Sequence, residues 1–175
     1  MQPGVSVDVA NEKRDNGADA EQDRLNQLML SGVRAGLRVV RLKGDDPLVF
    51  ARGAEEIAFL RQHGVEPTVV PGLSNALAAP LLGGVSLTAR DVADRVFVCT
   101  AALKGGGMPT DWPPYQPNCT WVVLMPVRRL RALADLLISP AHGFPAEVGA
   151  ALVENASLGR QQVSSFGLFV GSSRA

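Results

Sequence analysis

The sequence Arg-Leu-Lys-Gly-Asp-Asp-Pro-Leu-Val-Phe-Ala-Arg-Gly-Ala-Glu-Glu, residues 41–56, decides the fold expected for this chain. The apolar run Leu37–Leu42 leads into it and is typical of a buried strand. Asp45, Asp46 and Pro47 then favour a tight turn. A helix should begin near Gly53, with two carboxylates in its first turn, where the positive end of the helix dipole stabilises them. A polar loop at the carboxyl end of a strand is where open α/β sheets bind small ligands, although the pattern alone favours an ordinary strand-to-helix connection.

The residues of this stretch resemble the Arg-Leu-Lys-Gly-Gly-Asp-Pro-Phe-Ile-Phe-Gly-Arg-Gly-Gly-Glu-Glu element of the uroporphyrinogen-III C-methyltransferases, which belong to the tetrapyrrole methylase family. Four further blocks are similar to family motifs and follow in the family's order: Val-Pro-Gly-Leu-Ser at 70–74, Leu-Thr-Ala-Arg-Asp at 87–91, Met125, and Val-Glu-Asn-Ala at 153–156. A single such motif is weak evidence, whereas five in register are strong evidence of the family.

The resemblance implies an α/β fold of two lobes, with a mostly parallel N-terminal sheet, a mixed C-terminal sheet and a cofactor cleft between them. We place the N-terminal lobe at residues 1–75 and the C-terminal lobe at 76–175. Apolar segments predict strands at 5–10, 37–42, 68–70, 95–101, 121–125, 148–153 and 162–166. Helical periodicity predicts helices from Ala20, near 53–63, 75–82 and 127–138. The face of the first helix should carry Leu25, Leu28, Met29 and Val33.

Composition excludes several classes of function. Seventeen basic residues balance seventeen acidic ones over 175 residues, so no global field attracts nucleic acid or an anionic membrane. The longest apolar stretch, 121–127, is too short to span a bilayer, and the N-terminus shows no secretion signal. Two separated cysteines favour reduced thiols, and two histidines without spaced cysteine pairs disfavour a metal site. We therefore expect a cytoplasmic protein that acts on a small molecule.

The resemblance implies S-adenosyl-L-methionine as the cofactor and uroporphyrinogen III as the tetrapyrrole substrate. Its pyrrole carbons would be methylated to give precorrin-2 in sirohaem biosynthesis. Methyl transfer depends mainly on alignment of the methyl group with its acceptor. Backbone groups in glycine-rich loops suit this task because they approach a ligand without side-chain bulk. The implied cofactor-binding residues are Gly44, Asp45, Asp46, Val49, Ser74, Asn75, Met125 and Ala156.

The resemblance also implies roles in binding and chemistry for four cationic residues. Arg14, Arg52 and Arg90 would bind the carboxylates of the tetrapyrrole, because a guanidinium pairs with a carboxylate bidentately. Lys13, aligned with a Gly-Lys-Arg motif, would be the catalytic residue. Without the family, Lys13 and Arg14 would be interpreted as solvated loop charges. The family further implies a homodimer.

Departures from the family pattern leave alternatives open. Family glycines are replaced at Asp45, Ala51, Ala54 and Ala156, and the family's Leu-Thr-His-Arg-Asp has Ala89 in place of its histidine. The family's Gly-Pro-Gly-Asp-Pro loop and the aspartate after it have no counterpart in residues 1–12, so we expect little turnover from this chain alone. One alternative is a non-catalytic fragment that binds S-adenosylmethionine or a tetrapyrrole, and another is a methylase of a precorrin. A generic nucleotide-binding domain is disfavoured, since no Gly-x-Gly-x-x-Gly follows a predicted strand.

Overall fold

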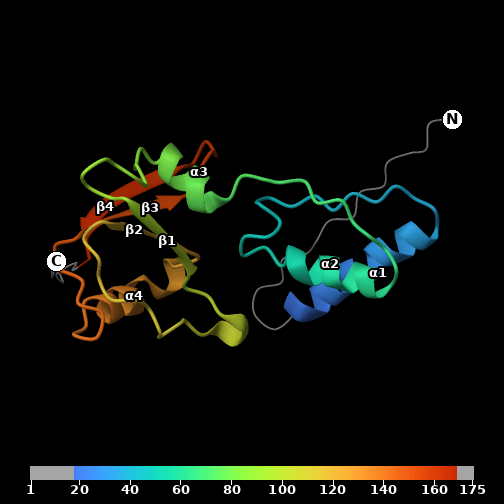
Figure 1. Cartoon of the computed structure of the whole chain (residues 1–175), viewed down its shortest axis with the longest axis horizontal. Coiled ribbons are helices and arrows are strands. Elements are labelled where there is room, and N and C mark those ends of the chain that lie inside the picture. The colour runs from blue at the N-terminus through green and yellow to red at the C-terminus, as the bar shows by residue number, and fades with distance from the viewer. Residues whose placement is uncertain (1–17, 169–175) are drawn as a thin grey trace. The chain divides into compact units, whose positions relative to one another are not determined.

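The structure is a computed structural model that describes residues 18–168. The chain divides into two compact units, which we call unit 1 (residues 1–72) and unit 2 (residues 73–175) (Figure 1). Each unit is described by itself. Within residues 18–168, no helix is long and apolar enough to cross a membrane, and the longest, α1, has 17 residues.

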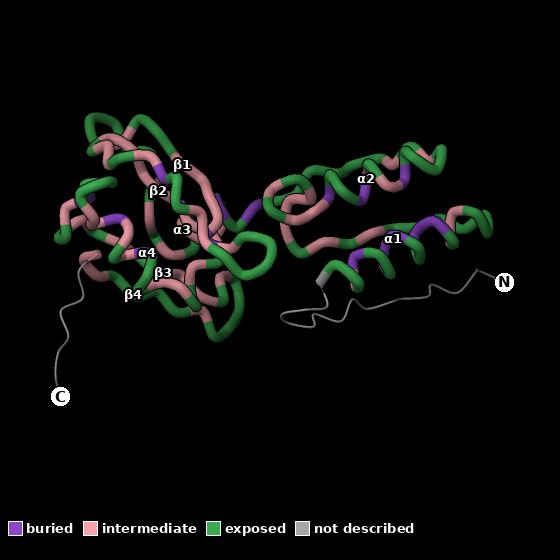
Figure 2. The backbone as a smooth tube through the Cα atoms, turned by 90° about the horizontal axis from the view of Figure 1, so that it is seen from below, coloured by how far each residue is buried: buried purple, intermediate pink, exposed green. Residues whose placement is uncertain are grey.

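The described part of unit 1 is built on two helices, α1 (Ala18–Arg34) and α2 (Gly53–Gln62), which lie side by side (Figures 1 and 2). Buried positions recur along α1 at three- and four-residue spacing, as an amphipathic helix requires. The buried face includes Leu25, Met29 and Leu30, whereas Leu28, predicted to lie on it, is exposed. The buried face also includes two polar residues, Gln22 and Asn26, so the middle of that face lies on a side of the helix away from Leu28.

The strands predicted at 37–42 and 68–70 are not formed, so the expected parallel sheet is absent from residues 18–72. Leu42 is 84% exposed and Val70 is 75% exposed. A strand needs a neighbour that accepts and donates its backbone hydrogen bonds, and neither segment pairs with another strand in the described residues. Val39 packs closely on Gly32 of α1, its Cγ2 lying 2.8 Å from where a Cβ would stand. The interpretation of the apolar pattern as a buried strand is therefore wrong.

Unit 2 contains the strands of the structure. β1 (Arg95–Thr100) pairs in parallel with β2 (Cys119–Leu124), and β3 (Gly149–Glu154) pairs antiparallel with β4 (Gln162–Gly167). All four lie within two residues of their predicted ends. They form two separate two-stranded sheets rather than one mixed sheet. The α/β class is confirmed.

Two helices accompany the strands of unit 2. α3 (Asn75–Leu82) packs on β2, and the amide of Gln161 donates to the carbonyl of Leu82 at the end of α3 over 3.0 Å. α4 (Leu130–Leu137) follows a 3₁₀ turn over Val127–Arg129 and buries Leu133 and Leu137, as its periodicity predicted.

The core of unit 2 is aromatic. Trp112, Leu133, Leu137 and Phe144 are buried together, and Trp121 of β2 stacks on Trp112 with ring centroids 5.8 Å apart. Trp121 also meets the edge of Phe144 at 4.8 Å. Trp112 belongs to a stretch for which neither a strand nor a helix was predicted, because its few apolar residues among prolines and glycines show no periodicity that would reveal burial.

Cys99 of β1 packs against this aromatic core. Burial raises the pKa of its thiol to about 11, because the thiolate would lose hydration there. The neutral thiol is therefore the form that the folded chain holds near neutral pH.

Replacing Trp112 by Ala should destabilise unit 2 by about 3–5 kcal/mol, the usual cost of deleting a large aromatic side chain from a core. Urea unfolding followed by circular dichroism measures this loss. Leu103→Ala is the control, because Leu103 lies in the same connection but is 48% exposed. A loss below about 1 kcal/mol for Trp112→Ala would contradict the assignment of this residue to the core.

Candidate functional site

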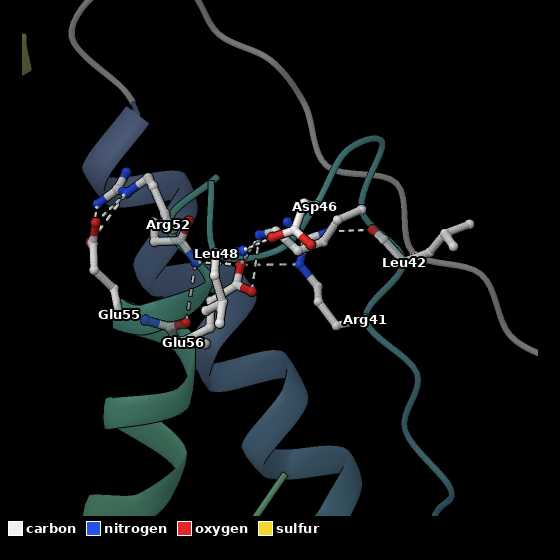
Figure 3. A network of polar contacts seen from close by, with 10 residues as sticks. Arg41, Leu42, Asp46, Leu48, Arg52, Glu55 and Glu56 are labelled. Carbon is white, nitrogen blue, oxygen red and sulfur yellow. Dashed lines mark hydrogen bonds and ion pairs between the residues drawn. The ribbon is translucent and has the colours of Figure 1, made fainter. Parts of the chain in front are cut away.

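The loop from Gly44 to Phe50 is folded around the carboxylate of Asp46 (Figure 3). One oxygen, Oδ1, accepts a hydrogen bond from the backbone N–H of Leu48 at 2.9 Å. The other, Oδ2, accepts from the N–H of Gly72 at 3.1 Å, although Gly72 is 26 residues further along the chain. Asp46 therefore closes its own turn and ties the loop to the segment at Pro71–Gly72. The side chain of Asp45 accepts from the N–H of Asp46 at 3.0 Å.

These hydrogen bonds also act on the protonation of Asp46. The N–H donors of Leu48 and Gly72 lower the pKa of its carboxyl below the ordinary value of 3.8, because they stabilise the anion. A lowered folded-state pKa means that the stabilisation is fully present above pH 3.8 and is lost as the pH falls through the lowered value. The hydrogen bonds that Asp46 accepts from Leu48 and Gly72 are therefore intact at neutral pH.

Two glycines are required by the close packing of this loop. The backbone N–H of Gly53 donates to the carbonyl of Pro47 at 2.9 Å. A Cβ on Gly53 would overlap that carbonyl oxygen. A Cβ on Gly72 would lie 3.0 Å from the carbonyl oxygen of Asp45. Gly44 differs, because no atom of residues 18–168 outside its own chain neighbours lies within 4 Å of its Cβ position. A ligand can therefore approach the backbone at Gly44.

The loop is also strained. Phe50 and Arg52 have left-handed φ values of 52° and 60°, and such residues cost about 1–3 kcal/mol each unless the surrounding structure holds them. Strain of this kind is concentrated at binding and catalytic sites.

The segment that leads into the loop is anchored on a buried carboxylate, that of Glu56 in α2. Its Oε1 accepts hydrogen bonds from Gln22 Nε2 at 3.0 Å, Arg41 Nε at 3.2 Å and Lys43 Nζ at 3.1 Å. Oε2 accepts from Lys43 at 3.1 Å. The Glu56 side chain is 7% exposed. The sequence pattern predicted only that Glu56 interacts with the helix dipole. Its ion pairs could have been suspected from the two cations, Arg41 and Lys43, that precede it in the same motif.

Arg52, predicted to bind substrate, lies at the N-terminal cap of α2. Its Nη2 donates to Glu55 Oε2 at 2.7 Å and to Asp19 Oδ1 of α1 at 2.9 Å. These carboxylates raise the pKa of Arg52, so its charge is secure. Arg52 thus lies just after the loop that contains Asp46, and its guanidinium already binds the carboxylates of Glu55 and Asp19.

The predicted site residues of unit 2 lie at the ends of its elements. Ser74 caps α3, its Oγ accepting from the N–H of Ala76 at 3.2 Å, and Asn75 is the first residue of that helix. Met125 directly follows β2 with φ 57° and is 52% exposed. Ala156 follows β3 in the turn after Asn155, whose φ is 50°. Arg90 is exposed in the turn closed by the Ala89–Ala93 bridge.

The structure brings some of the predicted residues together and leaves others apart. Gly44, Asp45, Asp46 and Val49 share one loop of unit 1, with Arg52 at its end. In unit 2, the parallel register pairs Thr100 with Leu124, so Met125 lies at the carboxyl edge of the β1–β2 pair. Lys13 and Arg14 lie outside the described residues.

Comparison of the sequence with protein families gives one match that spans nearly the whole chain. The model for Tetrapyrrole (Corrin/Porphyrin) Methylases matches residues 2–167. Over 140 residues the chain is 42% identical to a probable uroporphyrinogen-III C-methyltransferase of Schizosaccharomyces pombe, covering 80% of this chain and 28% of that protein. Over 152 residues it is 40% identical to a siroheme synthase of Nitrosospira multiformis, covering 86% and 32%. The chain thus spans about a third or less of the length of these relatives.

Solved structures agree with the sequence comparison. The uroporphyrin-III C-methyl transferase of Thermus thermophilus, complexed with S-adenyl homocysteine, superposes with a TM-score of 0.70 at 36% identity. The match covers 84% of this chain and 64% of that one. A cobalt precorrin-4 methyltransferase superposes with a TM-score of 0.69 at 20% identity, which shows a shared fold alone. The resemblance expected from the motifs is confirmed.

Two glycine substitutions in the loop should have opposite consequences. Gly53→Ala should destabilise unit 1 by about 1–3 kcal/mol, because the new methyl group forces α2 away from Pro47. Gly44→Ala should change the free energy of unfolding by less than about 0.5 kcal/mol, because open space surrounds that position. Thermal and urea unfolding of both variants measure the difference. Equal losses would show that the loop does not pack against α2 as described.

Proposed function

We propose, because this chain belongs to the tetrapyrrole (corrin/porphyrin) methylase family, that it is part of an S-adenosylmethionine-dependent uroporphyrinogen-III C-methyltransferase. The likeness to the Thermus thermophilus enzyme, solved with S-adenyl homocysteine, carries this proposal. The relatives named for uroporphyrinogen-III methylation and for siroheme synthesis support the same acceptor and a product, precorrin-2, on the route to sirohaem.

The loop of unit 1 fits this cofactor. The Asp46 carboxylate accepts hydrogen bonds from two N–H groups of the chain itself, so it serves to shape the loop. Open space at Gly44 allows close approach of a ligand to the backbone. The proposed cofactor-binding residues are Gly44, Asp45, Asp46 and Val49 in unit 1, and Ser74, Asn75, Met125 and Ala156 in unit 2.

When bound, S-adenosylmethionine supplies a methyl group that is already activated by the sulfonium. The residues of the chain therefore have to orient the two reactants and hold the acceptor. Arg52 and Arg90, with Arg14, are proposed to bind the carboxylates of the tetrapyrrole, and Lys13 to take part in the chemistry. For Arg52 this requires a substrate carboxylate to replace Asp19, whose side chain is 54% exposed, while Glu55 keeps the guanidinium oriented.

The same resemblance supports a cytoplasmic homodimer as the working form. Free Cys99 and Cys119 are in keeping with a reducing compartment.

Binding of S-adenosylhomocysteine tests the cofactor assignment through a matched pair of neighbouring aspartates. Asp46→Ala should weaken binding, because it removes the carboxylate that joins Leu48 to Gly72. Asp45→Gly should leave binding unchanged or strengthen it, because it restores the family's glycine and loses only the local contact to the N–H of Asp46. Calorimetric titration of both variants and the unaltered chain measures the effect.

Incorporation of labelled methyl groups into uroporphyrinogen III separates binding from turnover in the same proteins. We expect little methyl transfer from this chain alone. Binding without transfer would favour a non-catalytic fragment, whereas binding with transfer would support the active enzyme. Loss of binding in Asp45→Gly alone, with Asp46→Ala intact, would show that the loop is aligned wrongly with the family by one residue.

A further inference from the structure

We propose that Glu56 is a positioning residue for the cofactor-binding loop, acting through Lys43 and Arg41 on the backbone that precedes Gly44. The inference rests on the proposed function, because it assigns the Gly44–Phe50 loop to the cofactor. A buried carboxylate on α2 sets the conformation of that loop and its affinity for the cofactor.

The burial of this cluster makes its hydrogen bonds necessary. Side-chain exposure is 7% for Glu56, 10% for Lys43 and 29% for Arg41. A buried carboxylate is tolerated only when cations and hydrogen-bond donors surround it, and removing one partner leaves the others uncompensated. The carboxylate of Glu56 receives donors from α1, through Gln22, and from the segment before the loop, through Lys43 and Arg41.

The position of the cluster links it to the loop. Lys43 is the residue immediately before Gly44, and its ammonium contacts both oxygens of Glu56. Arg41 adds a hydrogen bond from Nη1 to the carbonyl of Leu42 at 2.7 Å, which fixes the backbone between the two cations. Within the loop, the carbonyl of Pro47 accepts a hydrogen bond from the N–H of Gly53, the first residue of α2. The loop is therefore anchored to α2 at two points, and Figure 3 shows the contacts of Glu56 and Arg41.

The strain inside the loop explains why such anchoring is needed. Phe50 and Arg52 adopt left-handed φ values, and the loop would relax if one end were released. The Asp46 clamp to Leu48 and Gly72 fixes the middle of the loop but does not fix Lys43. Glu56 supplies that missing constraint. A ligand that contacts backbone groups at Gly44 is sensitive to shifts of about 1 Å, which can change binding or rate by orders of magnitude.

The charges around Glu56 support an active role over simple packing. The two cations that face it, Arg41 and Lys43, exceed its single negative charge, while Gln22 and Asn26 from α1 are neutral. Without the carboxylate, the ammonium group of Lys43 and the guanidinium group of Arg41 would repel each other at the start of the loop. Loss of Glu56 should therefore move the loop before it unfolds the helices.

Four variants test the inference in the 175-residue chain. Glu56→Gln keeps the shape but removes the charge, and Lys43→Gln releases only the residue next to Gly44. Lys43→Arg keeps the cation and should rescue most of the effect. Glu66→Gln is the matched control, because Glu66 pairs with Arg61 at the other end of α2 and is exposed. S-adenosylhomocysteine affinity is measured by calorimetry, amide exchange of the peptide over 44–50 by mass spectrometry, and stability by thermal unfolding.

Glu56→Gln and Lys43→Gln should weaken S-adenosylhomocysteine binding about tenfold or more and accelerate exchange over 44–50. Lys43→Gln should have these effects while α1 and α2 stay protected from exchange. If Glu56→Gln fails to fold, Lys43→Gln provides the test of the inference. Unchanged affinity and unchanged loop exchange would overturn the inference, as would equal effects in Glu66→Gln. If the unaltered chain binds no S-adenosylhomocysteine, the proposed function fails, and the loop exchange alone supports or overturns the role of Glu56.

Discussion

The buried carboxylate of Glu56 joins three parts of unit 1, namely α1, α2 and the segment before the Gly44–Phe50 loop. It receives a donor from α1, belongs to α2, and holds the segment before the loop through two cations. The apolar core of the described part of unit 1 is small, with Leu25, Met29, Leu30 and Leu60 as its buried hydrophobic residues. Apolar contacts are not directional, whereas the hydrogen bonds to this buried carboxylate are. The donors on its two sides therefore fix the arrangement of helices and loop more precisely than apolar contacts alone.

In unit 2 the candidate residues are positioned by the ends of strands. Parallel pairing of β1 and β2 brings their carboxyl ends to one edge, and the chain leaves β2 through Met125 in a left-handed conformation. Asn155 after β3 and Asp91 in the turn beside Arg90 also have left-handed φ values. Strained non-glycine residues thus fall at or beside positions that the family motifs assign to binding, which is where such strain is usually retained.

The sequence predicted the helices and the strands of unit 2 because their apolar residues recur at helical or strand spacing and pack against neighbours inside the same unit. It failed at Leu37–Leu42, where the apolar run indicated a buried strand but no partner strand is available in the described residues. It also missed Trp112, whose burial depends on contacts with Trp121 and Phe144 from other parts of the chain. Periodicity records local geometry, and it carries no information on distant partners.

Motif order drew attention to the loop around Asp46, but the hydrogen bonds that shape this loop could not be predicted from it. Asp46 was expected to contact the cofactor, and its carboxylate also accepts hydrogen bonds from the N–H groups of Leu48 and Gly72, the latter from a separate motif. Glu56 was assigned to the helix dipole, although it anchors Arg41 and Lys43. Such roles follow from hydrogen bonds between residues far apart in sequence, so they emerge only once the chain is folded.

We propose that the cofactor contacts unit 1 at the Gly44–Leu48 backbone. Titration of the isotopically labelled chain with S-adenosylhomocysteine, followed by amide resonances, tests it most directly. The account predicts saturable shifts that are largest at Gly44–Leu48 and at Gly72, which is hydrogen-bonded to Asp46. Saturable shifts elsewhere in the chain, with these amides unmoved, would contradict it.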